Sequence, residues 1–139
     1  MDVLVLIGRI LFSLLFLSSA YGHLGQTQAM AGYAKSKGVP SAAAAVIVTG
    51  VMLLAGGLMV LLGIWADLGA LILGVFLIPT AIIMHGFWRE SDPQAKTMEM
   101  VQFNKDLALG GASLMLLAFF SFVGSDLGLT ITGPLFDIT

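Results

Sequence analysis

Residues 41–88 read SAAAAVIVTGVMLLAGGLMVLLGIWADLGALILGVFLIPTAIIMHGFW, and this stretch decides the fold. Asp67 is its only acidic residue, and it has no lysine or arginine. Two apolar runs, Ser41–Ile64 and Leu68–Trp88, are each long enough to cross a bilayer as a helix, since about 20 residues span a hydrocarbon core of about 30 Å. The three residues between them, Trp65-Ala66-Asp67, predict a tight turn between two antiparallel transmembrane helices.

Two further apolar stretches, Val3–Tyr21 and Phe103–Val123, have a similar length. Backbone polar groups cannot stay unpaired in lipid, so all four stretches are expected to be helices. The composition agrees, with 58% hydrophobic and 10% charged residues, against about a quarter charged in soluble domains. We therefore predict an all-α membrane protein, a four-transmembrane-helix antiparallel bundle that runs up-down-up-down. Residues 1–139 are expected to form one domain that ends in an irregular tail, 124–139.

Several classes of function find no support in the composition. The chain has no cysteine, which removes disulfides, thiolate metal ligands and a CxxC redox pair. We predict no metal site. The net charge is only −2, and the basic residues form no stripe interleaved with aromatic residues, so nucleic-acid binding is not expected. Any sulfur or thiol chemistry would belong to a partner or a substrate.

The two long linkers predict the orientation in the membrane. Residues 23–40 are long enough for a short interfacial helix before Pro40 starts the next span. Residues 89–102 contain Asp92-Pro93, a signal for a turn or a helix start. Four spans place both termini on one side and the two linkers on the other. The linker side is the more basic, so the positive-inside rule predicts cytoplasmic linkers and external termini; its basic residues are Lys35, Lys37, Arg89, Lys96 and Lys105.

Arg9 interrupts the first apolar stretch, about 9 Å along the expected helix. A charged side chain inside a membrane helix is costly unless it has a partner. One interpretation is that Arg9 extends to the outer interface, keeping its head in water. The other, which we adopt as the prediction, is a buried charge that turns inward to an acidic or hydroxyl partner among Asp67, Ser121, Ser125 and Asp126.

Polar and aromatic side chains gather at the linker-side ends of the spans. His23 ends the first helix, while His85 and Trp88 end the third, where their i, i+3 spacing predicts a shared helical face. Because Asn104 begins the fourth helix at the same membrane depth, we expect these residues to surround one cavity. The candidate ligand-binding residues are His23, Tyr33, His85, Trp88, Asn104, Lys105 and Asp106, and no catalytic residue is assigned.

A quinone head group suits this set, because its carbonyl oxygens accept hydrogen bonds while aromatic side chains hold its ring. Asp106 would then offer a path for protons. An alternative is a haem with His23 and His85 as axial ligands, which is less favoured because two histidines are few and their spacing is not diagnostic. A third interpretation is an ordinary interfacial belt of polar and aromatic residues without a ligand.

A series of short motifs follows the chain from the first to the fourth expected helix: Gly8-Arg9-Ile10-Leu11, Phe16-Leu17, Gly22-His23-Leu24, Ala34, Gly38-Val39-Pro40, Gly56-Gly57-Leu58, Leu62-Gly63, Phe76-Leu77-Ile78-Pro79-Thr80-Ala81, His85-Gly86-Phe87-Trp88, Gln102-Phe103-Asn104-Lys105 and Leu107-Ala108-Leu109-Gly110-Gly111. In these motifs the chain resembles the DoxX family of small bacterial membrane proteins, from Gly8 to about Phe120. The resemblance implies a four-helix protein of the bacterial inner membrane. Some relatives are linked to thiosulfate:quinone oxidoreduction or to membrane complexes that handle oxidative stress. Where the family often starts its fourth helix with Asn-Lys or Lys-Asn and an apolar residue, this chain has an acidic third residue, so the family's ligand does not transfer directly.

Three functions stay open at this point. The first is an accessory subunit of a membrane redox assembly that binds quinone or lipid at the linker end. The second is a quinone-reducing oxidoreductase subunit whose electron donor is a separate protein. The third is a lipid-binding, small-molecule-binding or structural membrane protein without a redox role. Expected partners are the bilayer and either other redox subunits or further copies of the chain.

Overall fold

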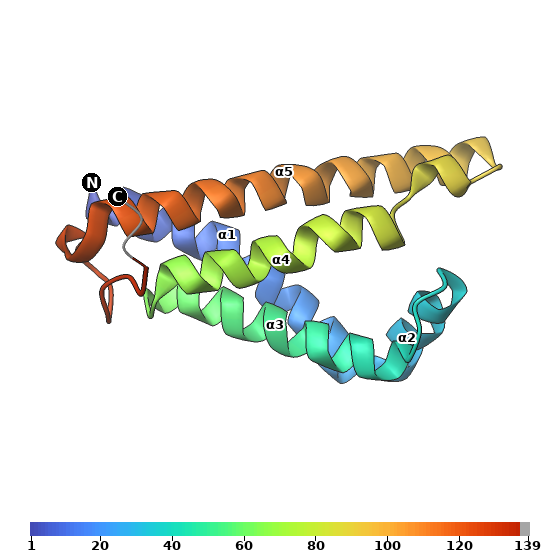
Figure 1. The fold of residues 1–139 in the computed structure, drawn as a ribbon, viewed down its shortest axis with the longest axis horizontal. Helices are drawn as coiled ribbons and strands as arrows, with labels where there is room; N and C mark the ends of the chain where they lie inside the picture. Colours follow the sequence, from blue (N-terminus) through green and yellow to red (C-terminus); the bar gives the residue numbers. More distant parts are fainter. Residues whose placement is uncertain (137–139) are drawn as a thin grey trace.

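The computed structural model describes residues 1–136 and consists of helices joined by short connections, followed by a C-terminal tail (Figure 1). The N-terminus, the described part of the C-terminal tail and the α3–α4 turn lie at one end of the molecule, here called the terminal end (Figure 1). The short helix α2 and the α4–α5 connection lie at the opposite end, called the linker end (Figure 1). The elements are α1 (Asp2–Gly25), α2 (Thr27–Ser36), α3 (Ala42–Leu62), α4 (Ala66–Met84), the 3-10 turn η1 (Phe87–Arg89), α5 (Pro93–Val123) and the 3-10 turn η2 (Gly124–Asp126).

The four long helices pack in chain order, α1 on α3, α3 on α4 and α4 on α5. Each is long and apolar enough to cross a membrane, which confirms the predicted all-helical class with four membrane spans. The core centres on α3 and α4, where Leu53 and Leu73 are completely buried. These two helices approach closely, since a Cβ atom on Gly69 would lie 3.0 Å from the carbonyl oxygen of Gly56. Small residues permit such packing in lipid.

Local signals place the helix boundaries, and two predicted boundaries are wrong. The fourth span does not begin at Phe103. Its helix begins ten residues earlier, because the Asp92 carboxylate accepts a hydrogen bond from the Ala95 amide and Pro93 occupies the first turn. The third helix ends at Met84 rather than Trp88, and a short turn follows. In that turn Trp88 folds back over Gly86, where a Cβ atom would lie 3.0 Å from the indole ring.

Arg9 turns into the protein and is 3% exposed. The prediction of an acidic or hydroxyl partner is wrong, because its guanidinium group binds three backbone carbonyl oxygens instead. Nε donates to Val60 at 2.8 Å, Nη2 to Leu61 at 2.6 Å and Nη1 to Leu129 at 2.8 Å. Val60 and Leu61 lie in the last turn of α3, whose carbonyl groups have no helical partners and carry the negative end of the helix dipole. A buried cation therefore caps α3.

The tail from Leu127 onward is tied to the terminal end by backbone hydrogen bonds. The amides of Ile131 and Thr132 both donate to the carbonyl oxygen of Gly63 at 3.0 Å. The Asp67 carboxylate is fully buried and accepts hydrogen bonds from two further tail amides, those of Leu135 at 2.8 Å and Phe136 at 2.6 Å. Asp67, one of the partners expected for Arg9, thus holds the tail instead.

Candidate functional site

Seven polar residues meet at the linker end, and Glu99 joins three of them. Its Oε1 atom accepts hydrogen bonds from the Lys37 ammonium at 2.8 Å and the Tyr33 hydroxyl at 3.2 Å. Its Oε2 atom lies 2.8 Å from Nδ1 of His85. The Glu99 carboxylate of α5 therefore contacts Tyr33 in α2, Lys37 directly after α2 and His85 directly after α4. We call the whole group the polar cluster; it consists of Tyr33, Lys37, His85, Glu90, Glu99, Lys105 and Asp106.

His85 lies between two carboxylates. Beside the contact with Glu99, its Nε2 atom lies 3.7 Å from Oδ2 of Asp106. That distance suits an ion pair but exceeds a hydrogen bond. Because Nδ1–H donates to the Glu99 carboxylate, Nε2 can donate to another acceptor only when the ring carries both protons. Asp106 is buried and also pairs with Lys105 at 3.3 Å. The arrangement brings the imidazole of His85, two carboxylates and the phenol of Tyr33 together at the linker end.

The lengths of α4 and α5 bring His85 and the two carboxylates to the same depth. Helix α4 ends at Met84, so His85 stands at the end of a membrane span. Helix α5 has 31 residues, about 46 Å, and so extends well beyond a hydrocarbon core of about 30 Å. Glu99 and Asp106 are seven residues apart on α5, two turns along one face. The face that meets His85 therefore carries a carboxylate on each side of the imidazole.

Three aromatic rings stand beside the polar cluster. Phe87 and Trp88 of η1 pack edge-to-face with Phe103 of α5, at centroid distances of 5.4 and 5.5 Å, and also with one another at 5.3 Å. Trp88 is about half exposed. Phe103 lies on α5 between Glu99 and Asp106 in sequence. An aromatic surface and hydrogen-bonding groups thus occupy the same depth at the linker end.

Charge pairing shifts the titration of the two cluster residues that come from the first linker. The hydrogen bond to Glu99 raises the pKa of the Lys37 ammonium well above its usual range, and a second contact with Glu90 at 3.0 Å adds to the rise. Burial raises the pKa of the Tyr33 phenol, and the Glu99 carboxylate raises it further. Both residues therefore keep their protons at neutral pH, and Lys37 remains a cation that balances the carboxylates.

The structure brings four of the seven candidate residues into this network: Tyr33, His85, Lys105 and Asp106. Trp88 lies beside it, but the predicted alignment of His85 and Trp88 on one helical face is wrong, because α4 ends at Met84. His23 makes its contacts elsewhere. Its Nδ1 atom lies 2.9 Å from the carbonyl oxygen of Ser19, and its ring packs edge-on against Phe76. Asn104 is exposed on α5.

Three members of the polar cluster were not anticipated from the sequence: Lys37, Glu90 and Glu99. Two signals could have identified Glu99. The Asp92-Pro93 pair starts α5 early enough to include it, and the seven-residue spacing from Asp106 then places both carboxylates on one face. Lys37 and Glu90 lie in connections and carry no spacing that predicts their meeting.

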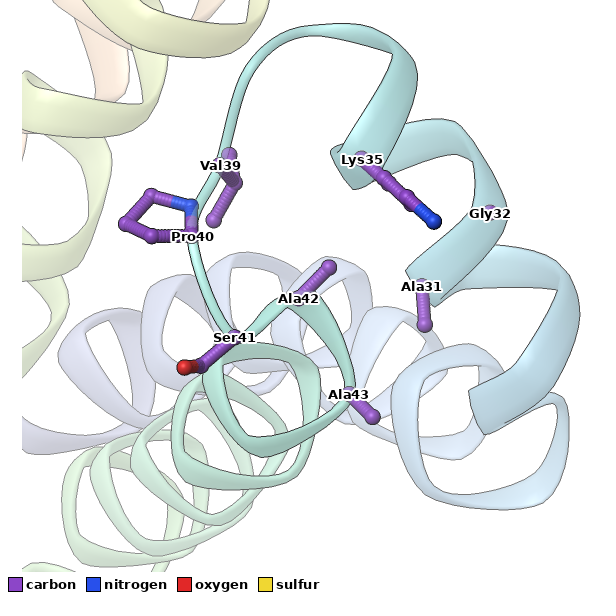
Figure 2. A pocket seen from close by; sticks show the side chains of 8 residues that line it. All are labelled: Ala31, Gly32, Lys35, Val39, Pro40, Ser41, Ala42 and Ala43. Atoms are coloured by element: carbon purple, nitrogen blue, oxygen red, sulfur yellow. The ribbon is translucent and has the colours of Figure 1, made fainter.

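Two cavities lie apart from the polar cluster. One, of about 500 Å³, lies between α2 and the first turn of α3 (Figure 2). The other, of about 450 Å³, is an apolar groove between α1 and α5 that includes Arg9 and Phe12. None of the seven candidate ligand-binding residues lines either cavity. Among residues 1–136, no three His, Asp or Glu side chains are grouped to hold a metal ion.

Four apolar helices in chain order, with buried charges at one end and a polar cluster at the other, define a multi-pass membrane protein. The model of one family of such proteins, DoxX, matches residues 4–86. The chain belongs to the DoxX family. The match covers α1 to α4 and ends before α5, so Glu99 and Asp106 lie outside it, as do the fourth-helix motifs of the resemblance. Comparisons with curated proteins and with solved structures find no significant match.

Proposed function

We propose that this DoxX-family protein is an accessory subunit of a membrane redox assembly and binds a quinone head group at the polar cluster. The observation that carries the proposal is the position of His85 between two carboxylates: its Nδ1–H donates to Glu99, and Nε2 lies beside Asp106, where it can donate to a further acceptor when the ring carries both protons. A quinone carbonyl oxygen needs such a donor at the end of a membrane span. The ring edges of Trp88 and Phe103 offer an apolar surface at the same depth.

The proposed chemistry is binding and proton exchange. With both ring nitrogens protonated, His85 would donate from Nε2 to a quinone oxygen. Reduction of that oxygen would take up this proton, and Glu99 or Asp106 could then return a proton to the ring. Tyr33 and Lys37 extend the hydrogen-bonded chain toward the first linker. The electrons would come from a partner subunit. An enzyme subunit that reduces quinone itself is the alternative within the same site.

A structural function is the rival, because Glu99 ties α2 to α5 through contacts that involve no ligand. The two histidines separate these possibilities. Replacement of His85 by Ala should lower the amount of quinone that co-purifies in mild detergent about tenfold, the effect of losing one hydrogen bond of about 1.4 kcal/mol. His23→Ala is the matched control, since its imidazole contacts Ser19 and Phe76 rather than the cluster.

Mass spectrometry of extracted lipids gives the readout for these variants. A quinone that co-purifies with wild type and His23→Ala but is depleted in His85→Ala supports the proposal. If the quinone content is the same in all three proteins, or if wild type carries none after purification from quinone-containing membranes, only the structural function remains.

We also propose that the linker end faces the cytoplasm of a bacterial cell and that the protein resides in the inner membrane. The support is the distribution of the basic residues. Arg9 is buried at the terminal end, while the other five lie at the linker end, where the positive-inside rule places them in the cytoplasm: Lys35, Lys37, Arg89, Lys96 and Lys105.

A further inference from the structure

One of the two cavities opens at the linker end, where α2 turns into α3 (Figure 2). Its position is set by α3, a membrane span that begins at Ala42. The cavity therefore lies at the depth of the lipid head groups. It has about 500 Å³ of space, and its lining is made of small or apolar side chains with one lysine and one serine: Ala31, Gly32, Lys35, Val39, Pro40, Ser41, Ala42 and Ala43.

Lys35 supplies a positive charge at this cavity. Lys35 is one of the lining residues, and Figure 2 shows its side chain extending along α2 toward Gly32 at the edge of the cavity. Within residues 1–136 no carboxylate lies within 4.0 Å of its ammonium group, whereas Lys37, two residues further on, pairs with both Glu90 and Glu99. The first linker thus carries one lysine engaged in the polar cluster and one that remains available to an external anion.

The first turn of α3 places no negative charge beside the cavity, because it contains no acidic residue. Ser41 stands at the N-cap of α3 without a capping hydrogen bond, and Figure 2 shows its hydroxyl group directed away from Lys35. Gly32 adds room, because a Cβ atom there would meet no other atom within 4 Å.

We propose that this cavity binds the phosphate group of an anionic phospholipid, with Lys35 as the charged contact. A lipid is the occupant favoured by position, since the site opens at the start of a membrane span, where phosphates are concentrated. It is also favoured by the apolar lining from Val39, Pro40 and the alanines, which suits the glycerol backbone and the first acyl carbons. The proposal is independent of quinone binding, because no residue of the polar cluster lines this cavity.

The test is a binding titration of the full chain in detergent, followed by native mass spectrometry. Phosphatidylglycerol is the probe, and diacylglycerol with the same acyl chains lacks the phosphate. Wild type should retain the phospholipid and not the diacylglycerol. Lys35→Ala should weaken phosphatidylglycerol binding at least about fivefold, the effect of one basic residue at an anionic surface. Lys96→Ala, an equal loss of charge on an exposed and unpaired lysine of the same end, should leave the affinity within about twofold of wild type.

A second variant fills the cavity without removing charge. Gly32→Leu should place its side chain in the open space and weaken binding as much as Lys35→Ala, while Gly111→Leu on exposed α5, where space is also open, should have no effect. Equal affinity of wild type, Lys35→Ala and Gly32→Leu would overturn the proposal. An equal loss in Lys96→Ala would overturn it too, because the attraction would then be general to the surface.

Two further measurements separate the sources of phosphate and the two sites. Soluble glycerol phosphate should not compete with phosphatidylglycerol at equal concentration. If it binds as tightly as the lipid, the site takes a free phosphate and the lipid proposal is wrong. The content of co-purifying quinone should be unchanged in Lys35→Ala, and a parallel loss of quinone and phospholipid would contradict two independent sites.

Discussion

Replacing Arg9 with leucine should release the tail from the terminal end while leaving the four membrane helices in place. Leucine is apolar and shorter than arginine, and it cannot donate to the carbonyl groups of Val60, Leu61 and Leu129. The first two belong to α3 and the third to the tail. Arg9 is therefore the side chain through which α1 holds both.

The magnitude follows from the three hydrogen bonds and the burial. A hydrogen bond from a charged donor contributes about 1.5–3 kcal/mol, but desolvation of a buried guanidinium offsets several kcal/mol of that sum. Loss of the cation leaves only uncharged carbonyl groups without a partner. The attachment of the tail should therefore lose about 3 kcal/mol of free energy, the low end of the range for removing one partner of a buried ion pair. If the free energy of local opening falls by about 3 kcal/mol, the open state becomes roughly 100-fold more populated.

Hydrogen exchange of the tail amides measures this opening directly. The amides of Ile131 and Thr132 donate to Gly63, and they should exchange roughly 100-fold faster in Arg9→Leu. Arg89→Leu is the control, since Arg89 is exposed at the linker end. Unchanged protection of the tail in Arg9→Leu would show that the hydrogen bonds to Gly63 and Asp67 are enough to hold the tail. It would refute the conclusion that Arg9 holds the tail in place.

Three further predictions concern a turn, a titration and the orientation. Gly63→Ala should lower the melting temperature in detergent by several degrees, because Gly63 has φ of +66° and its Cβ position is occupied, with a nearest atom at 2.7 Å; a loss no larger than that of Gly111→Ala would contradict this. Tyr33 and Lys37 both have raised pKa values in the folded state, so their contribution to stability should be constant at neutral pH and decline above about pH 10. The phenolate absorbance that disappears in Tyr33→Phe should accordingly emerge above the usual tyrosine range, and emergence within that range would count against the contacts described. A reporter active only outside the cytoplasm should work when fused after Thr139, and activity of a cytoplasmic reporter there would reverse the orientation.

The four spans could be predicted because lipid imposes a simple rule, that a long apolar stretch must be a helix. Helix ends follow local capping instead. The apolar pattern begins at Phe103, but α5 begins at Pro93 because Asp92 caps it. Hydropathy therefore placed Glu99 in a linker, and the central carboxylate of the polar cluster was missed.

The partners of Arg9 could not be predicted for a different reason. Side-chain partners are visible in a sequence, whereas free backbone carbonyl groups are created only when a helix ends. The last turn of α3 and the irregular tail supply those carbonyl groups at Val60 and Leu129. The same applies to Asp67, whose carboxylate receives two tail amides that carry no residue signature.

The central claim is that a quinone ring binds beside His85 and Trp88, and the fluorescence of Trp88 tests it most directly. The chain has two tryptophans, so a Trp65→Phe background leaves Trp88 as the only reporter. Titration with a short-chain quinone should quench this fluorescence saturably, and His85→Ala in the same background should shift the midpoint about tenfold to higher concentration. Quenching that rises without saturation, and equally with and without His85, would show only partition of quinone into detergent and would contradict the site.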